Sequence, residues 1–300
     1  MVKASRARPT TTEQRNPRSR GLDRKPTREI LRVIHREDAR VARAVARELP
    51  QIARAVDAIA RALQRGGRLI YVGAGTSGRL ATLDAAECPP TFGVAPRLVQ
   101  AVIAGGRRAL TRAVEGAEDS PAQGARDLAA KRITANDVVV GLTASGSTPY
   151  VLGALAYARR RGAVTVGVAS NRRSPLARVA RILIAPQVGP EVIAGSTRMK
   201  AGTAQKLVLN MLSTAAMVRL GRVYDNWMIG VALTNRKLRE RGLRILIEAT
   251  GASVADAQRA LRQAGHDLRA ALVMLKRGTS AAEARRRLRQ ARGNLRKALG

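Results

Sequence analysis

Five short apolar runs alternate with amphipathic stretches in the middle of this 300-residue chain, and this alternation restricts the fold most. The runs cover Leu69–Val72, Leu98–Ile103, Val138–Leu142, Val164–Val168 and Arg181–Ile184. Helical periodicity lies between them, as in Ser120–Lys131 and Thr148–Arg160. Such alternation is typical of an α/β fold, with a mainly parallel sheet and helices on both faces. In such sheets, ligands bind at the carboxyl ends of the strands, near a topological switch point.

The chain is expected to have three parts. We predict an N-terminal arm and helix in residues 1–55, an α/β domain in 56–222 and a small C-terminal helical module in 223–300. Prolines in residues 1–26 suggest a flexible or wrapping arm. A helix is expected from Thr27 towards Leu49, with Pro50 as its breaker, and then others over Gln51–Gln64 and Met199–Arg219. The module should contain short helices separated by Gly251, Gly265-His266-Asp267 and Gly278-Thr279.

A loop of small residues follows the first apolar run. Gly73, Gly75 and Gly78 let the backbone turn tightly and approach a ligand closely. Thr76 and Ser77 offer hydroxyl groups, and the helix expected from about Gly78 would point free N–H groups at an anion. A phosphate suits these features, although a strand-to-helix turn without a ligand has the same composition.

Two common nucleotide-binding loops do not fit this segment. A Walker A loop is excluded because no Gly-Lys-Ser/Thr ending follows Gly78. The glycines satisfy G-x-G-x-x-G formally, but the next run, Leu98–Ile103, brings no carboxylate for a ribose. A dinucleotide is therefore not expected.

A second loop of this kind follows the third apolar run. Ser145, Gly146, Ser147 and Thr148 again combine hydroxyls with a glycine, and Pro149 suits the first turn of a helix. The two loops together could surround one phosphate. The alternative is that these serines and threonines only cap helices.

Composition narrows the class of protein. The formal net charge of +34 raises the question of nucleic acid, but aromatic residues make up only 2% of the chain, so stacking platforms are scarce. We expect nonspecific binding of polyanions and no specific nucleic-acid function. Cys88 is the only cysteine, and no apolar run has transmembrane length. A soluble, cytoplasmic protein without a membrane partner is the expectation.

Beyond these local patterns, long motifs resemble the N-acetylmuramic acid 6-phosphate etherases, a family of the sugar isomerase (SIS) superfamily. The matching segments are Thr12–Asn16, Leu22–Asp23, Gly73–Leu80, Leu83–Thr91, Val114–Ser120, Ala144–Tyr150 and Gly195–Lys206. The resemblance covers the chain from about Thr12 to its end, and the arginine-rich surface departs from it. It implies a SIS-type sheet in residues 56–222 and a UBA-like C-terminal module.

The resemblance also implies an activity. A carbon–oxygen lyase would cleave the lactyl ether of N-acetylmuramic acid 6-phosphate by elimination and water addition, giving N-acetylglucosamine 6-phosphate and D-lactate. This reaction belongs to peptidoglycan recycling and amino sugar catabolism, within carbohydrate metabolism. The family resemblance implies a homodimer and neither a metal nor an organic cofactor.

The resemblance further assigns site residues. Glu87 would protonate the departing lactate oxygen, and Glu118 would act as the base at carbon 2, with the opposite division of the two roles left open. An exposed charge at a helix end is the alternative for Glu87. The substrate and phosphate site would comprise Gly75, Thr76, Ser77, Gly78, Ser145, Gly146, Ser147, Thr148, Arg198 and Lys200. Rival functions are a non-enzymatic sugar-phosphate-binding regulator, an aldose–ketose isomerase and a basic nucleic-acid-binding protein.

Overall fold

The computed structural model describes residues 11–233 and 235–300, which form two compact units. The first, called the sheet unit here, contains the residues up to Ala85 together with Val99–Leu212. The second, the helical unit, contains Ala86–Leu98 and Ser213–Gly300. Residues 1–10 of the predicted arm lie outside the described residues. The domain boundaries and the UBA-like description of the module stay predictions.

The sheet unit is built on a five-stranded parallel sheet with the order β2-β1-β3-β4-β5. The strands are β1 (Leu69–Gly73), β2 (Val99–Ile103), β3 (Val138–Leu142), β4 (Val164–Val168) and β5 (Ile182–Ile184). Every residue of β1 and β3 is buried, as expected for apolar strands covered on both faces. The predicted α/β class with a SIS-like parallel sheet is confirmed.

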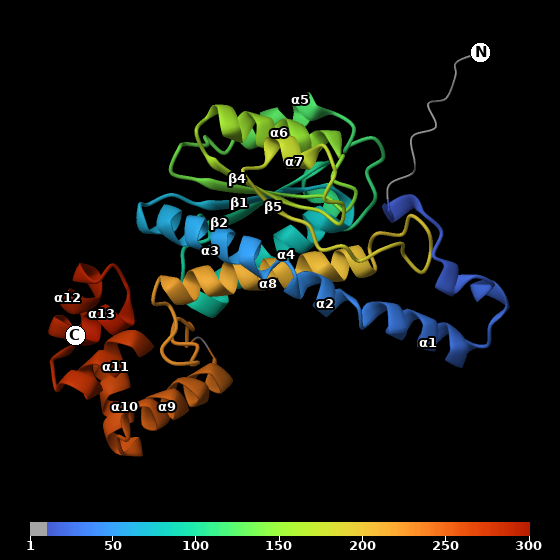
Figure 1. Ribbon diagram of the computed structural model, residues 1–300. Helices are drawn as coiled ribbons and strands as arrows, with labels where there is room; N and C mark the ends of the chain where they lie inside the picture. The colour runs from blue at the N-terminus through green and yellow to red at the C-terminus, as the bar shows by residue number, and fades with distance from the viewer. Residues whose placement is uncertain (1–10, 234) are drawn as a thin grey trace, which may run out of the picture. The chain divides into compact units, whose positions relative to one another are not determined.

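Helices cover both faces of this sheet (Figure 1). One face carries α5 (Pro121–Ala129), α6 (Pro149–Arg160) and α7 (Leu176–Val179), and the other carries α3 (Leu49–Gln64) and the first parts of α4 (Gly75–Phe92) and α8 (Lys200–Arg219). A short 3₁₀ helix, η4 (Gly106–Leu110), follows β2. Gly124 and Gly153 let α5 and α6 pack closely, since an added Cβ at either would come within 2.0 Å of a backbone oxygen of the opposite segment.

The N-terminal segment differs from the expectation. Its described part forms the 3₁₀ turns η1 (Thr11–Glu13), η2 (Pro17–Ser19) and η3 (Leu22–Arg24), followed by α1 (Thr27–Asp38) and α2 (Val41–Ala46). The single helix predicted towards Leu49 is therefore wrong, because the chain breaks at Ala39 and Arg40. Pro50 breaks no helix and lies in the first turn of α3, where its missing N–H costs nothing.

The helical unit ends in five short helices. They are α9 (Arg236–Thr250), α10 (Val254–Gln263), α11 (Leu268–Arg277), α12 (Ala281–Gln290) and α13 (Leu295–Leu299). Each begins after an Asn, Ser or Asp whose side chain accepts a backbone N–H of the first turn. Gly251 and Gly278 close α9 and α11 in the left-handed conformation, so the predicted breaks are confirmed. Among the described residues, no helix has the length and apolar character needed to cross a membrane.

Candidate active site

The strand order reverses between β1 and β3. These strands are parallel neighbours with Gly73 opposite Leu142, while β2 lies outside β1 and β4 outside β3. A crevice at the carboxyl end of such a switch point is where open α/β sheets bind ligands. The two hydroxyl-rich loops follow β1 and β3, so the structure brings them to adjacent strand ends.

The first loop is short and tightly packed. The helix α4 begins at Gly75, earlier than the expected Gly78, and Gly75 has a φ of +52°. An added Cβ at Gly73 would lie 2.7 Å from the Gly78 nitrogen, and one at Gly78 would lie 2.5 Å from Ile103 Cγ1. Thr76 is half-buried and Ser77 is buried. The glycines therefore fix the start of α4 against the end of β1, with free N–H groups at the strand edge.

The second loop is held together by its own hydroxyl groups. The hydroxyl of Thr143 lies 2.8 Å from that of Thr148 and 3.3 Å from that of Ser145, and it accepts the Gly146 N–H at 3.2 Å. Ser147 donates its hydroxyl to Ser145 Oγ at 2.9 Å. Thr143 is thus the centre of the loop, a role that the sequence reasoning missed although the residue directly follows the strand.

Gly146 sets the path of this second loop. Its φ is +78°, and an added Cβ would come within 2.2 Å of Ser174 Oγ. Both the backbone conformation and the close approach therefore require glycine. Its carbonyl accepts the Leu176 N–H at 3.0 Å, which ties the loop to the start of α7.

The first turn of α8 adjoins the first loop. A Cβ at Gly202 would lie 3.5 Å from Thr76 Cγ2, and the Gly202 N–H donates to the Thr197 carbonyl at 3.0 Å. Arg198 lies just before α8 and is exposed. The first turn of α8, which is part of the motif Gly195–Lys206, therefore lies against the first loop.

Glu118 lies beside the second loop. Its carbonyl accepts the Tyr150 N–H at 3.0 Å, where Tyr150 is in the first turn of α6, and its side chain is exposed. The Tyr150 hydroxyl donates to Asp127 of α5 at 2.6 Å. Burial raises the pKa of Tyr150, and the neighbouring Asp127 carboxylate raises it further. The close α5–α6 packing therefore holds the backbone of Glu118 near the loop, while its side chain is exposed to solvent.

Glu87 lies on α4 within the helical unit, and its side chain is exposed. It comes roughly three helical turns after Gly75 along the chain. Pro89 and Pro90 follow inside the same helix and supply no N–H to its hydrogen-bond ladder. The neighbouring Cys88 is buried. The catalytic role of Glu87 stays a prediction.

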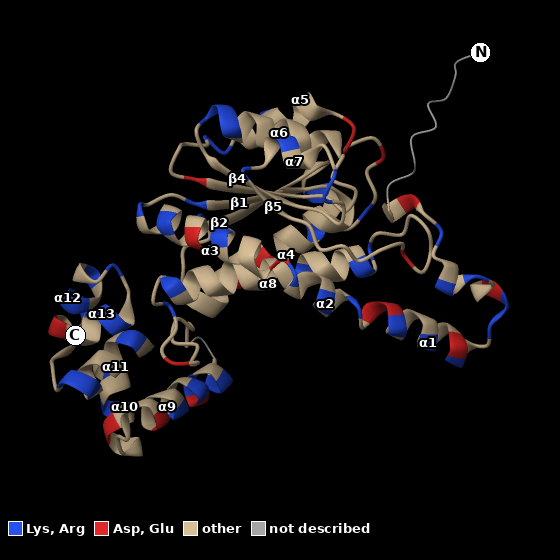
Figure 2. Cartoon of the chain, viewed as in Figure 1, with Lys and Arg blue, Asp and Glu red and all other residues tan. Residues whose placement is uncertain are grey.

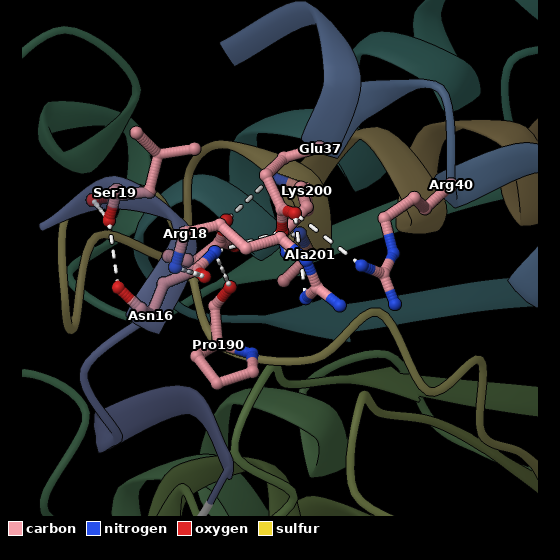
Figure 3. A network of polar contacts seen from close by, with 10 residues as sticks. Asn16, Arg18, Ser19, Glu37, Arg40, Pro190, Lys200 and Ala201 are labelled. Atoms are coloured by element: carbon pink, nitrogen blue, oxygen red, sulfur yellow. Dashed lines mark hydrogen bonds and ion pairs between the residues drawn. The ribbon is translucent and has the colours of Figure 1, made fainter. Parts of the chain in front are cut away.

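Lys200 is buried and paired, whereas a substrate-binding lysine would have to be open to the ligand. Its side chain is 1% exposed and its ammonium is paired with Glu37 of α1 (Figure 3). The Glu37 carboxylate also accepts Asn16 Nδ2 at 2.9 Å. Burial alone would raise the pKa of Glu37, but the hydrogen bonds from Lys200 and Asn16 outweigh it and hold the pKa below its usual value. Lys200 is thus committed to a partner within the sheet unit, so we leave it out of the proposed substrate site.

Glu191 completes this network from the other side. Its carboxylate accepts the backbone N–H groups of Lys200 and Ala201 at 3.0 and 2.9 Å, which caps the start of α8. Burial raises the pKa of Glu191, although these two donors oppose the shift. Asn16 Nδ2 also donates to the Pro190 carbonyl at 3.1 Å. The sequence reasoning missed Glu37 and Glu191, and the only signal was the Thr12–Asn16 motif, to which it gave no role.

Comparisons with known proteins show the same type of domain. Residues 51–159 match the glucokinase regulatory protein N-terminal SIS domain family, and residues 115–215 match the SIS domain family. The phosphoheptose isomerase of Neisseria gonorrhoeae has a similar fold, with a TM-score of 0.50 at 16% identity over 64% of this chain and 99% of that one.

Two curated relatives are similar over nearly the whole chain. The N-acetylmuramic acid 6-phosphate etherase of Geobacillus thermodenitrificans is 54% identical over 89% of this chain and 90% of its own length. The etherase of Aeromonas hydrophila is 56% identical over 88% of this chain and 89% of its own length. At this identity and coverage, the chain belongs to the N-acetylmuramic acid 6-phosphate etherase family.

Proposed function

We propose that this protein is a carbon–oxygen lyase that cleaves the lactyl ether of N-acetylmuramic acid 6-phosphate. The single observation that carries the proposal is the pair of hydroxyl-rich loops at the β1–β3 switch point in a chain of this family. The products are N-acetylglucosamine 6-phosphate and D-lactate, which fit a role in peptidoglycan recycling.

The chemistry follows from the substrate. When the sugar ring is open, the aldehyde at carbon 1 acidifies the hydrogen on carbon 2. A base removes that proton, the bond between carbon 3 and the ether oxygen breaks, and the oxygen leaves as lactate after taking a proton from an acid. Water then adds to the double bond between carbons 2 and 3, with its hydroxyl group going to carbon 3. One group must accept a proton and one must donate a proton.

Two glutamates are proposed for these steps. Glu118 is the base at carbon 2, because its backbone is fixed beside the second loop and its carboxylate is exposed to a ligand. Glu87 is the acid that protonates the departing oxygen. Each step of this kind contributes about 10²–10⁴-fold to the rate.

The phosphate is proposed to lie between the two loops. The backbone N–H groups at the start of α4 and the hydroxyls of Thr76, Ser77, Ser145 and Ser147 supply donors for its oxygens. Thr148 and Thr143 hold the second loop in shape through their 2.8 Å contact. Arg198, which is exposed just before α8, is proposed to add positive charge.

We also propose that the protein works as a homodimer in the cytoplasm. Large apolar side chains are exposed in the sheet unit, with Leu31 at 59% and Ile193 at 53% exposure. Burying such side chains against a second copy would be favourable. Light scattering coupled to size-exclusion chromatography measures the mass directly, and a monomer at working concentration would contradict this part.

Release of D-lactate from N-acetylmuramic acid 6-phosphate tests the function. The wild-type protein is expected to release one lactate per sugar without an added cofactor. Binding of the sugar phosphate without lactate release would instead support a non-enzymatic sensor. Conversion to a ketose phosphate would support an isomerase.

Matched variants test the roles. Glu118→Gln is expected to lower kcat by about 10²–10⁴-fold, while Glu115→Gln, in the same exposed segment, should leave kcat within about twofold. Glu87→Gln should lose lactate release and keep substrate binding. Ser77→Ala and Ser145→Ala should chiefly raise KM, and an unchanged KM in both would remove the loops from the phosphate site.

A further inference from the structure

The connection between β2 and α5 carries Glu118, the base of the proposed function, and has little regular structure. This segment, called the Glu118 connection here, covers residues 104–120 and contains η4 as its one helical element. The exposed Glu118 carboxylate can act as a base only if the backbone beneath it is held in place, because a misplacement of about 1 Å can cost roughly 10²-fold in rate. The contacts that hold this segment therefore bear on the reaction.

The end of the Glu118 connection is fixed by the helix that follows the second loop. The Tyr150 N–H donates to the Glu118 carbonyl at 3.0 Å. Ser120, two residues further on, caps α5 by accepting the Gln123 N–H at 3.1 Å. On the other side, Ala117 packs against buried side chains of the sheet core. The backbone is therefore held both before and after Glu118.

The middle of the Glu118 connection is fixed by one arginine of α4. Arg79 donates from Nε to the Ala109 carbonyl at 2.9 Å and from Nη2 to the Arg112 carbonyl at 3.1 Å. One planar guanidinium thus joins η4 to the turn that follows it. Arg79 is half-buried and comes directly after Gly78 of the first loop. The start of α4 is therefore bonded to the segment that leads to the proposed base.

The part of the connection that Arg79 holds also packs back on the end of β2. Gly105 has a φ of +80°, and an added Cβ there would lie 3.0 Å from Val114 Cβ and 3.2 Å from Ala109 Cβ. The Val114 carbonyl then accepts the Ala117 N–H at 3.4 Å, one residue before Glu118. A shift of η4 would be passed on to Glu118 through this compact turn.

Arg79 has no part in the proposed chemistry so far, although it belongs to the matching motif Gly73–Leu80. The glycines and hydroxyls of that motif are proposed to bind phosphate, and Glu118 belongs to a different motif, Val114–Ser120. The acceptors of the two Arg79 bonds are carbonyl groups, so the span of the guanidinium matters as well as its charge. The hydrogen bonds of Arg79 thus join one motif to the segment that carries the other.

We propose that Arg79 is a positioning residue, which holds the Glu118 connection so that the Glu118 carboxylate meets carbon 2 of the sugar. This inference rests on the proposed function, because that function makes Glu118 the base. Arg79 acts through Glu118 and touches no reacting atom. Arg79 follows the first loop and Tyr150 follows the second, so the two helices that begin at the phosphate loops also hold the base. Phosphate binding and placement of the base are thereby coupled.

Steady-state kinetics of D-lactate release by the full-length protein test this inference. Arg79→Gln is expected to lower kcat by at least about tenfold and to leave KM within about twofold, because the sugar still binds while the base is displaced. Arg79→Lys keeps the charge but cannot span both carbonyls, so its kcat should fall nearly as far. The control Arg159→Gln removes a bond to another carbonyl, that of Arg178 at 3.1 Å, and should keep kcat within about twofold.

A double-mutant cycle shows whether Arg79 acts through Glu118. In the Glu118→Gln background, Arg79→Gln should cost less than about twofold in kcat, because no base remains to be misplaced. A residue that merely stabilises the fold would give the same loss in both backgrounds, and that result would overturn the inference. If Arg79→Gln loses its far-UV circular dichroism, Arg79→Lys replaces it in the cycle.

The possible results separate this inference from the proposed function. A wild type that releases no lactate would contradict the proposed function and this inference with it. An active wild type together with an unchanged kcat in Arg79→Gln would contradict this inference alone. A raised KM at unchanged kcat would do the same, because Arg79 would then serve phosphate binding. Full activity of Arg79→Lys would also overturn the inference, since charge without the span would suffice.

Discussion

The buried charges of the sheet unit and of the helical unit are arranged in opposite ways. In the sheet unit, Lys200 is paired with Glu37, and Arg68 is paired with Asp137 at 2.8 Å. In the helical unit, the buried Nε of Arg222 has no hydrogen-bond partner among the described residues. Figure 2 shows residues of both signs in each unit, with an excess of basic ones in both.

This difference separates two uses of charge in one very basic chain. A buried pair holds distant segments together, as Glu37 holds the N-terminal segment to the start of α8. A buried donor without a partner, such as Arg222 Nε, costs stability instead. The paired charges of the sheet unit are therefore structural.

The largest effect on stability is expected for Lys200→Met. The change leaves the Glu37 carboxylate buried without its cation, which should lower the free energy of unfolding by about 3–5 kcal/mol. Lys206→Met, later in the same helix and half-buried, should cost about 1 kcal/mol or less. Urea denaturation followed by circular dichroism measures both. Equal losses of unfolding free energy in the two variants would mean that the Lys200–Glu37 pair does not stabilise the protein more than an ordinary lysine side chain does.

A somewhat smaller effect is expected for Asp137→Asn. This carboxylate accepts hydrogen bonds from the backbone and side chain of Arg68 and from the Thr134 N–H. Loss of its charge should reduce the free energy of unfolding by about 1.5–3 kcal/mol. The same denaturation experiment checks this value, and a change below about 0.5 kcal/mol would contradict the importance of the pair.

The pH dependence follows from the same groups. The pKa values of Glu37 and Asp137 are lowered in the folded protein, mainly by their cationic partners acting against burial. Their stabilisation is therefore complete above the unfolded pKa of about 4 and is lost as the pH falls through the folded pKa. Unfolding free energies measured across this range should decline in acid, and less so for Glu37→Gln. An identical decline in the two proteins would show that Glu37 does not contribute.

The smallest effect is expected for Arg222→Met. Because this substitution removes a half-buried guanidinium whose Nε has no partner among the described residues, the free energy of unfolding should change by less than about 1 kcal/mol or rise slightly. A loss of unfolding free energy as large as that of Lys200→Met would mean that the two units do not differ in how much their buried charges contribute to stability.

Most of the sheet was predictable from the sequence because the signal is local. Runs rich in Val, Ile and Leu, bounded by glycine and helical periodicity, located every strand to within a residue or so. The two loops could also be placed together, because parallel strands that are neighbours end at the same edge.

The long-range pairs were not predictable. The break at Ala39 follows Glu37, whose carboxylate is directed inward to Lys200, a residue 163 positions away. Lys200 itself looked like a ligand-binding cation, because the sequence does not reveal that Glu191 caps α8 and Glu37 covers the ammonium. The unpaired Arg222 was equally hidden among many arginines, since burial decides which of them matters.

Isotope labelling during turnover tests the proposed elimination most directly. The protein is incubated with N-acetylmuramic acid 6-phosphate in deuterated, ¹⁸O-enriched water, and both products are analysed by mass spectrometry and NMR. We predict deuterium at carbon 2 and ¹⁸O at carbon 3 of the N-acetylglucosamine 6-phosphate, with unlabelled oxygen in the lactate hydroxyl. Hydrogen retained at carbon 2 together with ¹⁸O in the lactate hydroxyl would contradict the mechanism, because water would then have attacked the lactyl carbon.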